Sequence, residues 1–273
     1  MTTLERYGFT AAMRTATEAP RAGESFARVV SGHGDYFHLM CDEAEGEIVA
    51  RKKASNFRDA DVVHPVTGDF VRFAFNPRGE SRILEVLPRF SALARVDPSS
   101  SGHGTQTIAV NFDTLFFVMS ANENFNLNRL ARIRALAEDS GCAERLVLVI
   151  SKRDLGVPPE TIPEGLPCIE LSVKTGEGMD AAREYAAPGK TVAMVGSSGV
   201  GKSSLVNALA GEEWMPVQEI QSWSGKGRHT TTSRELVMLP NGAMAIDTPG
   251  LREIGIPGEA AHRFHSTATH RFR

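Results

Sequence analysis

Five short segments between Glu24 and about Arg95 read as strands, and several of them alternate apolar and polar residues. Alternation at a period of two is typical of strands with one buried face. The segments read SFARVVS, YFHLMC, EIVARKKA, DFVRFAF and RILEVLPR, with the turn-like stretches GHGD, DEAEG, HPVTG and NPRGE between them. Residues 24–96 therefore predict a small all-β barrel of the OB or SH3-like type. Residues 1–23, which precede it, predict a poorly ordered tail.

The pattern changes after residues 97–106 (DPSSSGHGTQ), a stretch rich in Ser and Gly that predicts a linker between two domains. Beyond it, residues 114–120 and 145–151 are continuous apolar runs, as in parallel strands covered on both faces. Between these runs, residues 126–141 carry leucines and an isoleucine at helical spacing. Further strands are expected at 168–173, 191–197, 235–239 and 243–247, and a helix at 202–210. Residues 107–256 thus predict an α/β domain with a doubly wound, mostly parallel sheet.

The composition is that of an ordinary globular protein. A chain of 273 residues is long enough for two domains. Hydrophobic residues make up 41% and charged residues 23%, and the formal net charge is -3. Nothing global therefore points to nucleic acid or a membrane, and local clusters must carry any such inference.

The cysteines indicate a reducing compartment. Cys41, Cys142 and Cys168 are odd in number and widely spaced, which fits free thiols better than disulfides or a zinc site. No segment reads as a signal peptide or approaches the ~20 apolar residues of a membrane span. We expect a cytoplasmic protein without a membrane partner.

Residues 196–203 read GSSGVGKS and match the phosphate-loop pattern G-x-x-x-x-G-K-[ST] between a predicted strand and a predicted helix. Backbone N–H groups would surround the α- and β-phosphates, Lys202 would meet the β/γ oxygens, and the Ser203 hydroxyl would ligate Mg²⁺. A glycine-rich turn without a ligand is the alternative, which the flanking elements disfavour. The predicted nucleotide-binding residues here are Gly196, Ser197, Ser198, Gly199, Val200, Gly201, Lys202, Ser203 and Ser204.

A sensor for the γ-phosphate is predicted further along, in AMAIDTPG at 243–250. Asp247 would hold a magnesium-bound water, and the backbone N–H of Gly250 would reach the γ-phosphate. Between the two motifs, the polar stretch 225–235 (GKGRHTTTSRE) has the composition of a switch loop, in which Thr230 or Thr231 completes the Mg²⁺ shell. The predicted metal ligands are Ser203, Thr230, Thr231 and Asp247. A plain surface loop is the alternative for 225–235.

The residue that follows the sensor glycine Gly250 affects the expected rate of GTP hydrolysis. Many GTPases have a glutamine there that orients the attacking water, whereas this chain has Leu251. Hydrolysis should be slow unless His229 in the switch stretch, or a partner, orients the water. An exposed loop histidine without a catalytic role is the alternative. The candidate catalytic residues are His229, Lys202 and Gly250.

The segments that would recognise guanine come before the phosphate loop. Ser151-Lys152-Arg153-Asp154 resembles N/T-K-x-D, and Ser172-Val173-Lys174 resembles S-A-K. The Asp154 carboxylate can accept from N1–H and the exocyclic amine of guanine, and the stem of Lys152 can cover the ring. A backbone N–H near Val173 or Lys174 would meet O6. Ser151 replaces the usual Asn or Thr, and its shorter side chain should tie the neighbouring loops less firmly.

This order of motifs predicts a circularly permuted P-loop GTPase domain. With a small barrel in front, and with SKRD, SVK, GSSGVGKSS, GRHTTT and DTPGLREIG in succession, residues 24–256 resemble the RsgA (YjeQ-type) family of ribosome-small-subunit-dependent GTPases. The resemblance implies an OB-type N-terminal domain and hydrolysis of GTP to GDP and phosphate with Mg²⁺. It also implies stimulation by the small ribosomal subunit and its rRNA, a role in late maturation of that subunit, and a monomer.

The end of the chain departs from the family pattern. Members continue into a helical domain with a Cys/His zinc site, whereas 257–273 contain no cysteine. His262, His265 and His270 are expected to be solvated, and no zinc is expected in this chain. Truncation, a frameshift or a degenerate paralogue would each give such an end.

The barrel segment 50–58 (ARKKASNFR) combines positive charge with an aromatic residue. Such a cluster suits phosphate backbones and one stacked base, although a charge run is more often a solvated face. The predicted RNA-contacting residues are Arg51, Lys52, Lys53, Phe57 and Arg58.

Two other functions fit parts of the pattern. One is an RNA- or ribosome-binding module that binds GTP and GDP with little turnover, given Leu251 and the missing C-terminal domain. The other is a P-loop kinase or ATPase that uses ATP, which Asp154 disfavours.

Overall fold

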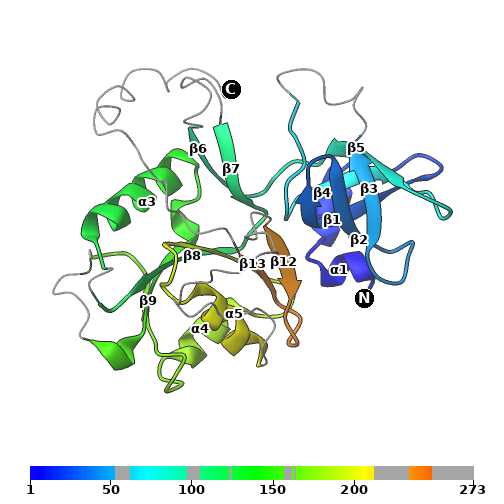
Figure 1. Cartoon of the computed structure of the whole chain (residues 1–273). Helices are drawn as coiled ribbons and strands as arrows, with labels where there is room; N and C mark the ends of the chain where they lie inside the picture. Colours follow the sequence, from blue (N-terminus) through cyan, green and yellow to red (C-terminus); the bar gives the residue numbers. More distant parts are fainter. Residues whose placement is uncertain are drawn as a thin grey trace, which may run out of the picture.

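The computed structural model describes residues 1–52, 62–96, 105–122, 125–156, 162, 164–211 and 234–247. It contains a β-barrel and an α/β domain that lie side by side (Figure 1). This arrangement is the predicted fold class.

The barrel is built from five strands: β1 (Glu24–His33), β2 (Tyr36–Cys41), β3 (Ile48–Lys52), β4 (Phe70–Ala74) and β5 (Ser81–Val86). The strands pair in the order β1-β2-β3-β5-β4, and β4 pairs again with β1, which closes the barrel. Only β3 and β5 run parallel within it. This is an OB-type topology. Inward residues at a period of two, such as Val29, Leu39, Phe73 and Ile83, fill the core.

The N-terminal segment corrects the expectation of a disordered tail over 1–23. It contains two short helices, α1 (Thr3–Arg6) and α2 (Ala11–Ala16), and Thr2 starts the first with a capping box to Glu5. Leu4 and Phe9 are buried, and the Phe9 ring lies 5.4 Å from Phe26 and 5.3 Å from Phe70 on the outside of the barrel. Burial of these two apolar side chains favours an ordered segment.

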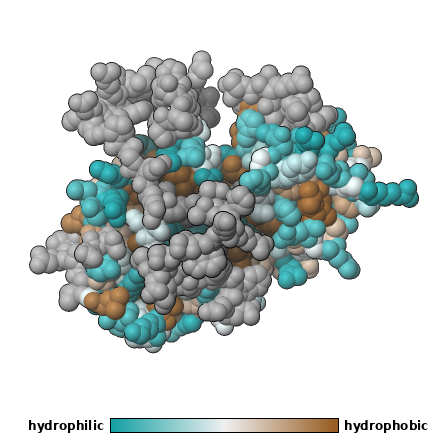
Figure 2. Space-filling view, in the orientation of Figure 1, coloured by the Kyte–Doolittle hydropathy of each residue, from teal (hydrophilic) through white to brown (hydrophobic). Residues whose placement is uncertain are grey.

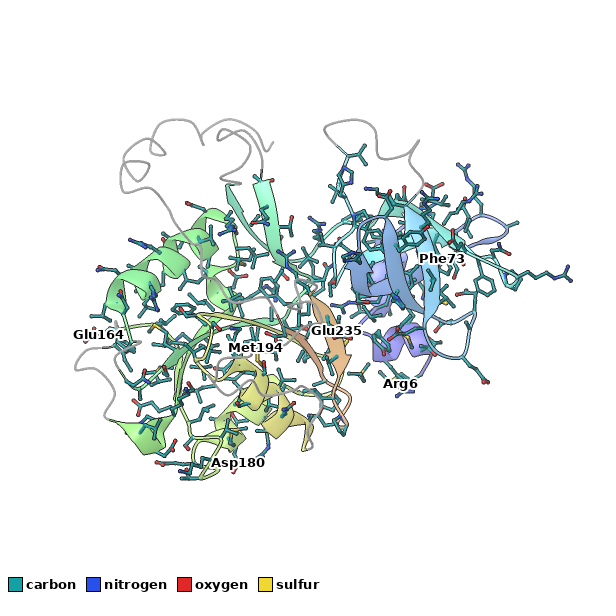
Figure 3. All side chains as sticks on the ribbon, in the orientation of Figure 1. Arg6, Phe73, Glu164, Asp180, Met194 and Glu235 are labelled. Carbon is teal, nitrogen blue, oxygen red and sulfur yellow. The ribbon has the colours of Figure 1, made fainter. Side chains whose placement is uncertain are left out.

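The α/β domain has a mostly parallel sheet. Its strands are β8 (Thr114–Ser120), β9 (Leu146–Ser151), β10 (Cys168–Glu170), β11 (Thr191–Gly196), β12 (Glu235–Met238) and β13 (Met244–Asp247). They lie in the order β10-β9-β8-β11-β13-β12, and of these six described strands only β12 is antiparallel to its neighbour within the domain. Figure 3 shows Met194 of β11 inside this sheet and Glu235 of β12 on the side facing the barrel.

Helices cover both faces of the sheet, which explains the continuous apolar runs. On one face, α3 (Leu127–Asp139) packs Leu130 and Ile133 against alternate residues of β8 and β9. On the other, α4 (Met179–Tyr185) and α5 (Lys202–Ala210) pack against the intervening residues. The described residues of this domain also form two 3₁₀ turns, η3 (Ala143–Arg145) and η4 (Arg153–Leu155). Figure 1 shows α3 on one side of the sheet and α4 and α5 on the other.

The predicted linker at 97–106 is a second correction. β6 (Ala92–Val96) pairs antiparallel with β7 (Thr105–Val110), so this range joins two strands that pair with each other. Leu93 and Ile108 belong to the core beneath α3. The barrel therefore ends with β5 rather than at residue 96. A Ser- and Gly-rich stretch fits a hairpin connection as well as a linker, so composition could not decide between them.

Arg28 fills the interface between the two domains. It is almost fully buried in β1 and donates to three carbonyl oxygens: Tyr7 (2.7 Å), Gly68 (3.1 Å) and Asn111 (2.9 Å). Its guanidinium also lies over the ring of Phe70. Burial lowers the pKa of Arg28 to about 10, so it stays charged at neutral pH.

Two further contacts join the barrel to the β12–β13 hairpin. Ser31 of β1 pairs with Glu235 of β12, which makes one continuous sheet of 11 strands. The Thr67 hydroxyl donates to the carbonyl oxygen of Arg234 at 3.0 Å. The barrel is thus packed directly against the hairpin that ends at Asp247.

On the face drawn in Figure 2, hydrophilic residues predominate and hydrophobic ones form small separate patches. Within the part of the chain that the structure describes, no helix combines the length and hydropathy needed to cross a membrane.

Candidate nucleotide site

Those of the predicted nucleotide-site residues that the structure describes lie at the carboxyl edge of the sheet. From β8 the chain goes outward to β9 and β10, and then returns to β11 on the other side of β8. Such a reversal leaves a crevice between the two central strands, where ligands bind in open α/β sheets. Because these strands run parallel, the carboxyl ends of β8, β9, β10, β11 and β13 all lie at this edge.

The phosphate loop has the geometry that its glycines predict. A side chain at Gly196 would collide with the carbonyl oxygen of Val118 on the neighbouring strand. Gly201 caps α5 with a left-handed backbone (φ 98°) and supplies no side-chain cap. Among the described residues, no acceptor takes the backbone N–H groups of 197–201. These donors, at the N-terminus of a nine-residue helix, form a ready anion site.

Lys202 is buried at the base of this loop. Its Nζ donates to the carbonyl oxygens of Gly196 (3.0 Å) and Ser197 (3.1 Å). Burial lowers its pKa, and the negative charge of Asp247 at the end of β13 acts in the opposite direction. The two residues therefore place interacting opposite charges at the phosphate site.

Asp247 fits a magnesium site. Its Oδ1 is buried and has no hydrogen-bond partner among the described residues. Burial raises its pKa, while Lys202 and a hydrogen bond with Ser203 lower it. A desolvated carboxylate beside a serine hydroxyl suits a hard cation with oxygen ligands. Ser203 and Asp247 thus fit Mg²⁺, and the other two predicted ligands, Thr230 and Thr231, lie outside the described residues.

The segment after β9 contacts the phosphate loop directly. The buried Ser151 hydroxyl lies 2.5 Å from the carbonyl oxygen of Val200 and 3.1 Å from that of Met119, within reach of either acceptor. Lys152, in a left-handed conformation (φ 60°), donates to the carbonyl oxygen of Gly199 at 2.7 Å. Serine is therefore long enough to bridge the two loops at this position.

Asp154 and the loop after β10 form the second half of the predicted base site. The exposed Asp154 carboxylate accepts from the hydroxyl of buried Ser172 at 2.7 Å, and this bond lowers the pKa of Asp154. Within the described part of the chain, no acceptor takes the backbone N–H of Val173 or Lys174. A fixed carboxylate and open N–H donors lie together, which is the set of groups that guanine requires.

One contact was not expected from the sequence. Arg129, in the first turn of α3, donates from Nη1 to the Ser197 hydroxyl at 3.0 Å. No motif marks this arginine. The contact depends on β8 lying beside β11, which brings the start of α3 to the phosphate loop.

The barrel places part of the predicted RNA cluster on β3. The guanidinium of Arg51 lies 5.5 Å from the ring centre of Tyr36, which is 45% exposed on β2. Lys52 pairs with Asp35 at 3.2 Å, so its charge is partly neutralised. Tyr36 is the aromatic partner that the sequence reading missed. Lys53, Phe57 and Arg58 lie outside the described residues, as do His229 and Gly250.

The sequence is similar to those of known proteins over most of its length. The sequence model of the RsgA GTPase family matches residues 86–257. The chain belongs to the RsgA GTPase family. Small ribosomal subunit biogenesis GTPase RsgA 2 of Lactiplantibacillus plantarum is 37% identical over 260 residues, which is 93% of this chain and 72% of the relative. RsgA 1 of Listeria innocua is 38% identical over 261 residues, with the same shares.

Solved structures support the same fold. YjeQ from Thermotoga maritima aligns with a TM-score of 0.57 and 25% identity, over 84% of this chain and 75% of that one. YloQ, described as a circularly permuted GTPase, aligns with a TM-score of 0.54 and 19% identity, over 85% of this chain and 74% of that one. The α/β part of this RsgA-family chain is a circularly permuted GTPase domain, preceded by an OB-type barrel.

Proposed function

We propose that this protein binds GTP, hydrolyses it to GDP and phosphate, and acts in maturation of the small ribosomal subunit in the cytoplasm. Family membership supports the activity, because the curated relatives are named as GTPases of small-subunit biogenesis. The main structural support is the contact of Ser151 and Lys152 with Val200 and Gly199. It joins the predicted base site and phosphate site, although the first precedes the second in the chain.

In this proposal, Asp154 accepts two hydrogen bonds from guanine, and Lys152 covers the ring with its stem. The backbone N–H of Val173 or Lys174 donates to O6. Adenine lacks the first two donors and presents an amine where guanine has O6, so these groups select guanine.

At the phosphate end of the proposed site, different groups bind the phosphates and the metal ion. The open N–H groups of 197–201 and Lys202 bind the phosphates, and Ser203 with Asp247 would hold Mg²⁺. When bound, the ion neutralises charge on the β- and γ-phosphate oxygens. In the overall reaction, water adds to the γ-phosphorus and the bond to the β–γ bridging oxygen breaks, which releases GDP and phosphate. Gly250 and His229 stay predictions for binding the γ-phosphate and orienting the water.

The barrel is the proposed contact with rRNA. Arg51 and Tyr36 present a positive charge and an exposed ring on adjacent strands, which suits a phosphate and a stacked base. Arg51→Glu should weaken binding to isolated small subunits and reduce the salt dependence of that binding. Arg82→Glu, on the neighbouring strand β5, controls for charge alone. Equal effects of the two substitutions would count against a specific contact.

A nucleotide titration tests the proposed function. The wild-type chain should bind GDP and GTP well and ATP poorly, and Asp154→Asn should lose at least tenfold in GDP affinity. Single-turnover hydrolysis, measured with and without small subunits, should be slow alone and faster with them. Full GDP affinity in Asp154→Asn would refute the base site. Binding without stimulated turnover would instead favour a binding module.

A further inference from the structure

We propose that Arg129 is a positioning residue for the phosphate loop and acts through Ser197. The proposal rests on the proposed GTP site and adds a residue that no nucleotide-binding motif includes. Its basis is the hydrogen bond from Arg129 Nη1 to Ser197 Oγ, between a helix and a loop 68 residues apart in the chain.

Arg129 is held in place by its helix. The side chain of Asn126 caps α3 and accepts from the backbone N–H of Arg129 at 3.2 Å. The next residue, Leu130, is buried in the core together with Ile133 one turn later. The backbone of Arg129 is therefore fixed relative to the sheet, which limits the positions that its side chain can reach.

Ser197 links this arginine to Lys202. The hydroxyl oxygen of Ser197 accepts from Arg129, while its backbone carbonyl oxygen accepts from Lys202 Nζ at 3.1 Å. One residue of the loop thus receives hydrogen bonds from two cations, one on its side chain and one on its backbone. Because its oxygen accepts from Arg129, the hydroxyl keeps its own hydrogen to donate to an anion.

The charge balance also points to a ligand. Within the described residues, no carboxylate lies within ion-pair distance of Arg129, which is exposed at the mouth of the loop. The open N–H groups of 197–201 face the same site. The hydrogen bond from Arg129 holds Ser197 in place before the nucleotide binds. The loop then needs less ordering on binding, because its N–H donors are already arranged for the phosphates.

The test is a double-mutant cycle read by GTP and GDP affinity in the full chain. Arg129→Ala should lower affinity about fivefold, as expected for one exposed hydrogen bond with a charged donor. Ser197→Ala should lower it at least as much, because it also removes the hydroxyl that can donate to the anion. The double variant should lose no more than Ser197→Ala alone, because that substitution already removes the bond to Arg129. Arg129→Lys should recover part of the loss. Arg132→Ala, an exposed arginine on the same helix, is the matched control and should bind like wild type.

The melting temperature of the nucleotide-free variants separates positioning from stability. It should stay at the wild-type value, because the bond is exposed. Losses that multiply in the double variant, an Arg129→Ala variant with wild-type affinity, or a matching drop in melting temperature would each overturn the proposal. The same titration includes ATP for the wild type. Wild-type binding with guanine preference but no effect of Arg129 would refute this inference alone, whereas no guanine binding at all would refute the proposed function as well.

Discussion

A single buried hydroxyl, that of Ser172, organises the loop proposed to bind the base. The oxygen of Ser172 accepts from the backbone N–H of Thr175 at 3.2 Å, and its hydrogen goes to the carboxylate of Asp154 at 2.7 Å. The Ser172 carbonyl also accepts from Gly176 at 2.9 Å. The exposed carboxylate is therefore held by a residue that is itself fixed in the core.

Ser172→Ala should weaken guanine binding while leaving the fold intact. Loss of the hydrogen bond removes the main cause of the lowered pKa of Asp154, so that pKa should rise toward its ordinary value. We expect about three- to tenfold weaker GDP binding and no change for ATP, measured by calorimetric titration at neutral pH. Thr175→Ala, in the same loop, is the control. An equal loss for GDP and ATP would contradict a role in base selection.

For individual residues, sequence motifs predicted much of the candidate site but not the neighbouring residues that hold it in position. Asp154, Lys202 and Asp247 belong to patterns in which residue type follows from chemistry, so spacing along the chain identified them. Arg129 belongs to no such pattern, since its position depends on which strands are neighbours. Strand order is a property of the whole sheet, and a local window of sequence does not contain it.

Strands were predictable from the sequence where one face of the strand is buried or where both faces are buried. Strands β2, β3 and β5 follow the alternation, and β8, β9 and β11 follow the continuous apolar runs. α1 and α2 were not predicted, because each spans fewer than two helical turns and shows no apolar periodicity. The β6–β7 hairpin was hidden by its Ser- and Gly-rich connection.

The N-terminal helices should contribute measurably to stability. Phe9→Ala removes a ring that packs against Phe26 and Phe70, and we expect a loss of about 3 kcal/mol in the free energy of unfolding. Urea denaturation followed by fluorescence or circular dichroism would measure it. Met13→Ala, at a partly buried neighbour, should have a smaller effect. A wild-type midpoint for Phe9→Ala would show that the segment is a dispensable tail after all.

In the molecule as a whole, the barrel and the GTPase domain share an interface centred on a charged residue. Arg28 bonds to the N-terminal segment, the barrel loop at Gly68 and the end of β7 at Asn111. Asn111 in turn donates to Gly68 at 3.1 Å and accepts from Phe90 at 3.0 Å. A planar guanidinium can satisfy three separate carbonyl groups in this way, which an ammonium group on a lysine stem does less well.

Arg28→Met should uncouple the two domains. The substitution removes the Arg28 hydrogen bonds to three carbonyl oxygens, of which Gly68 keeps its bond from Asn111, and we expect a loss of about 3 kcal/mol or more. Calorimetry should show one cooperative transition for the wild type and two for the variant. Arg28→Lys should resemble Arg28→Met, while Arg82→Met at an exposed barrel position should resemble wild type. A single unshifted transition in Arg28→Met would contradict this assignment.

The position of β11 between β8 and β13 has a consequence for biosynthesis. During translation, β8, β9 and β10 are synthesised before β11. β8 is therefore an unpaired edge strand of a three-stranded sheet until residues 191–196 leave the exit tunnel. All seven residues of β8 are buried in the finished domain. An unpaired apolar margin is prone to association with other chains. Slowing translation between residues 151 and 191 should therefore increase aggregation of the newly made protein more than the same delay placed after residue 211.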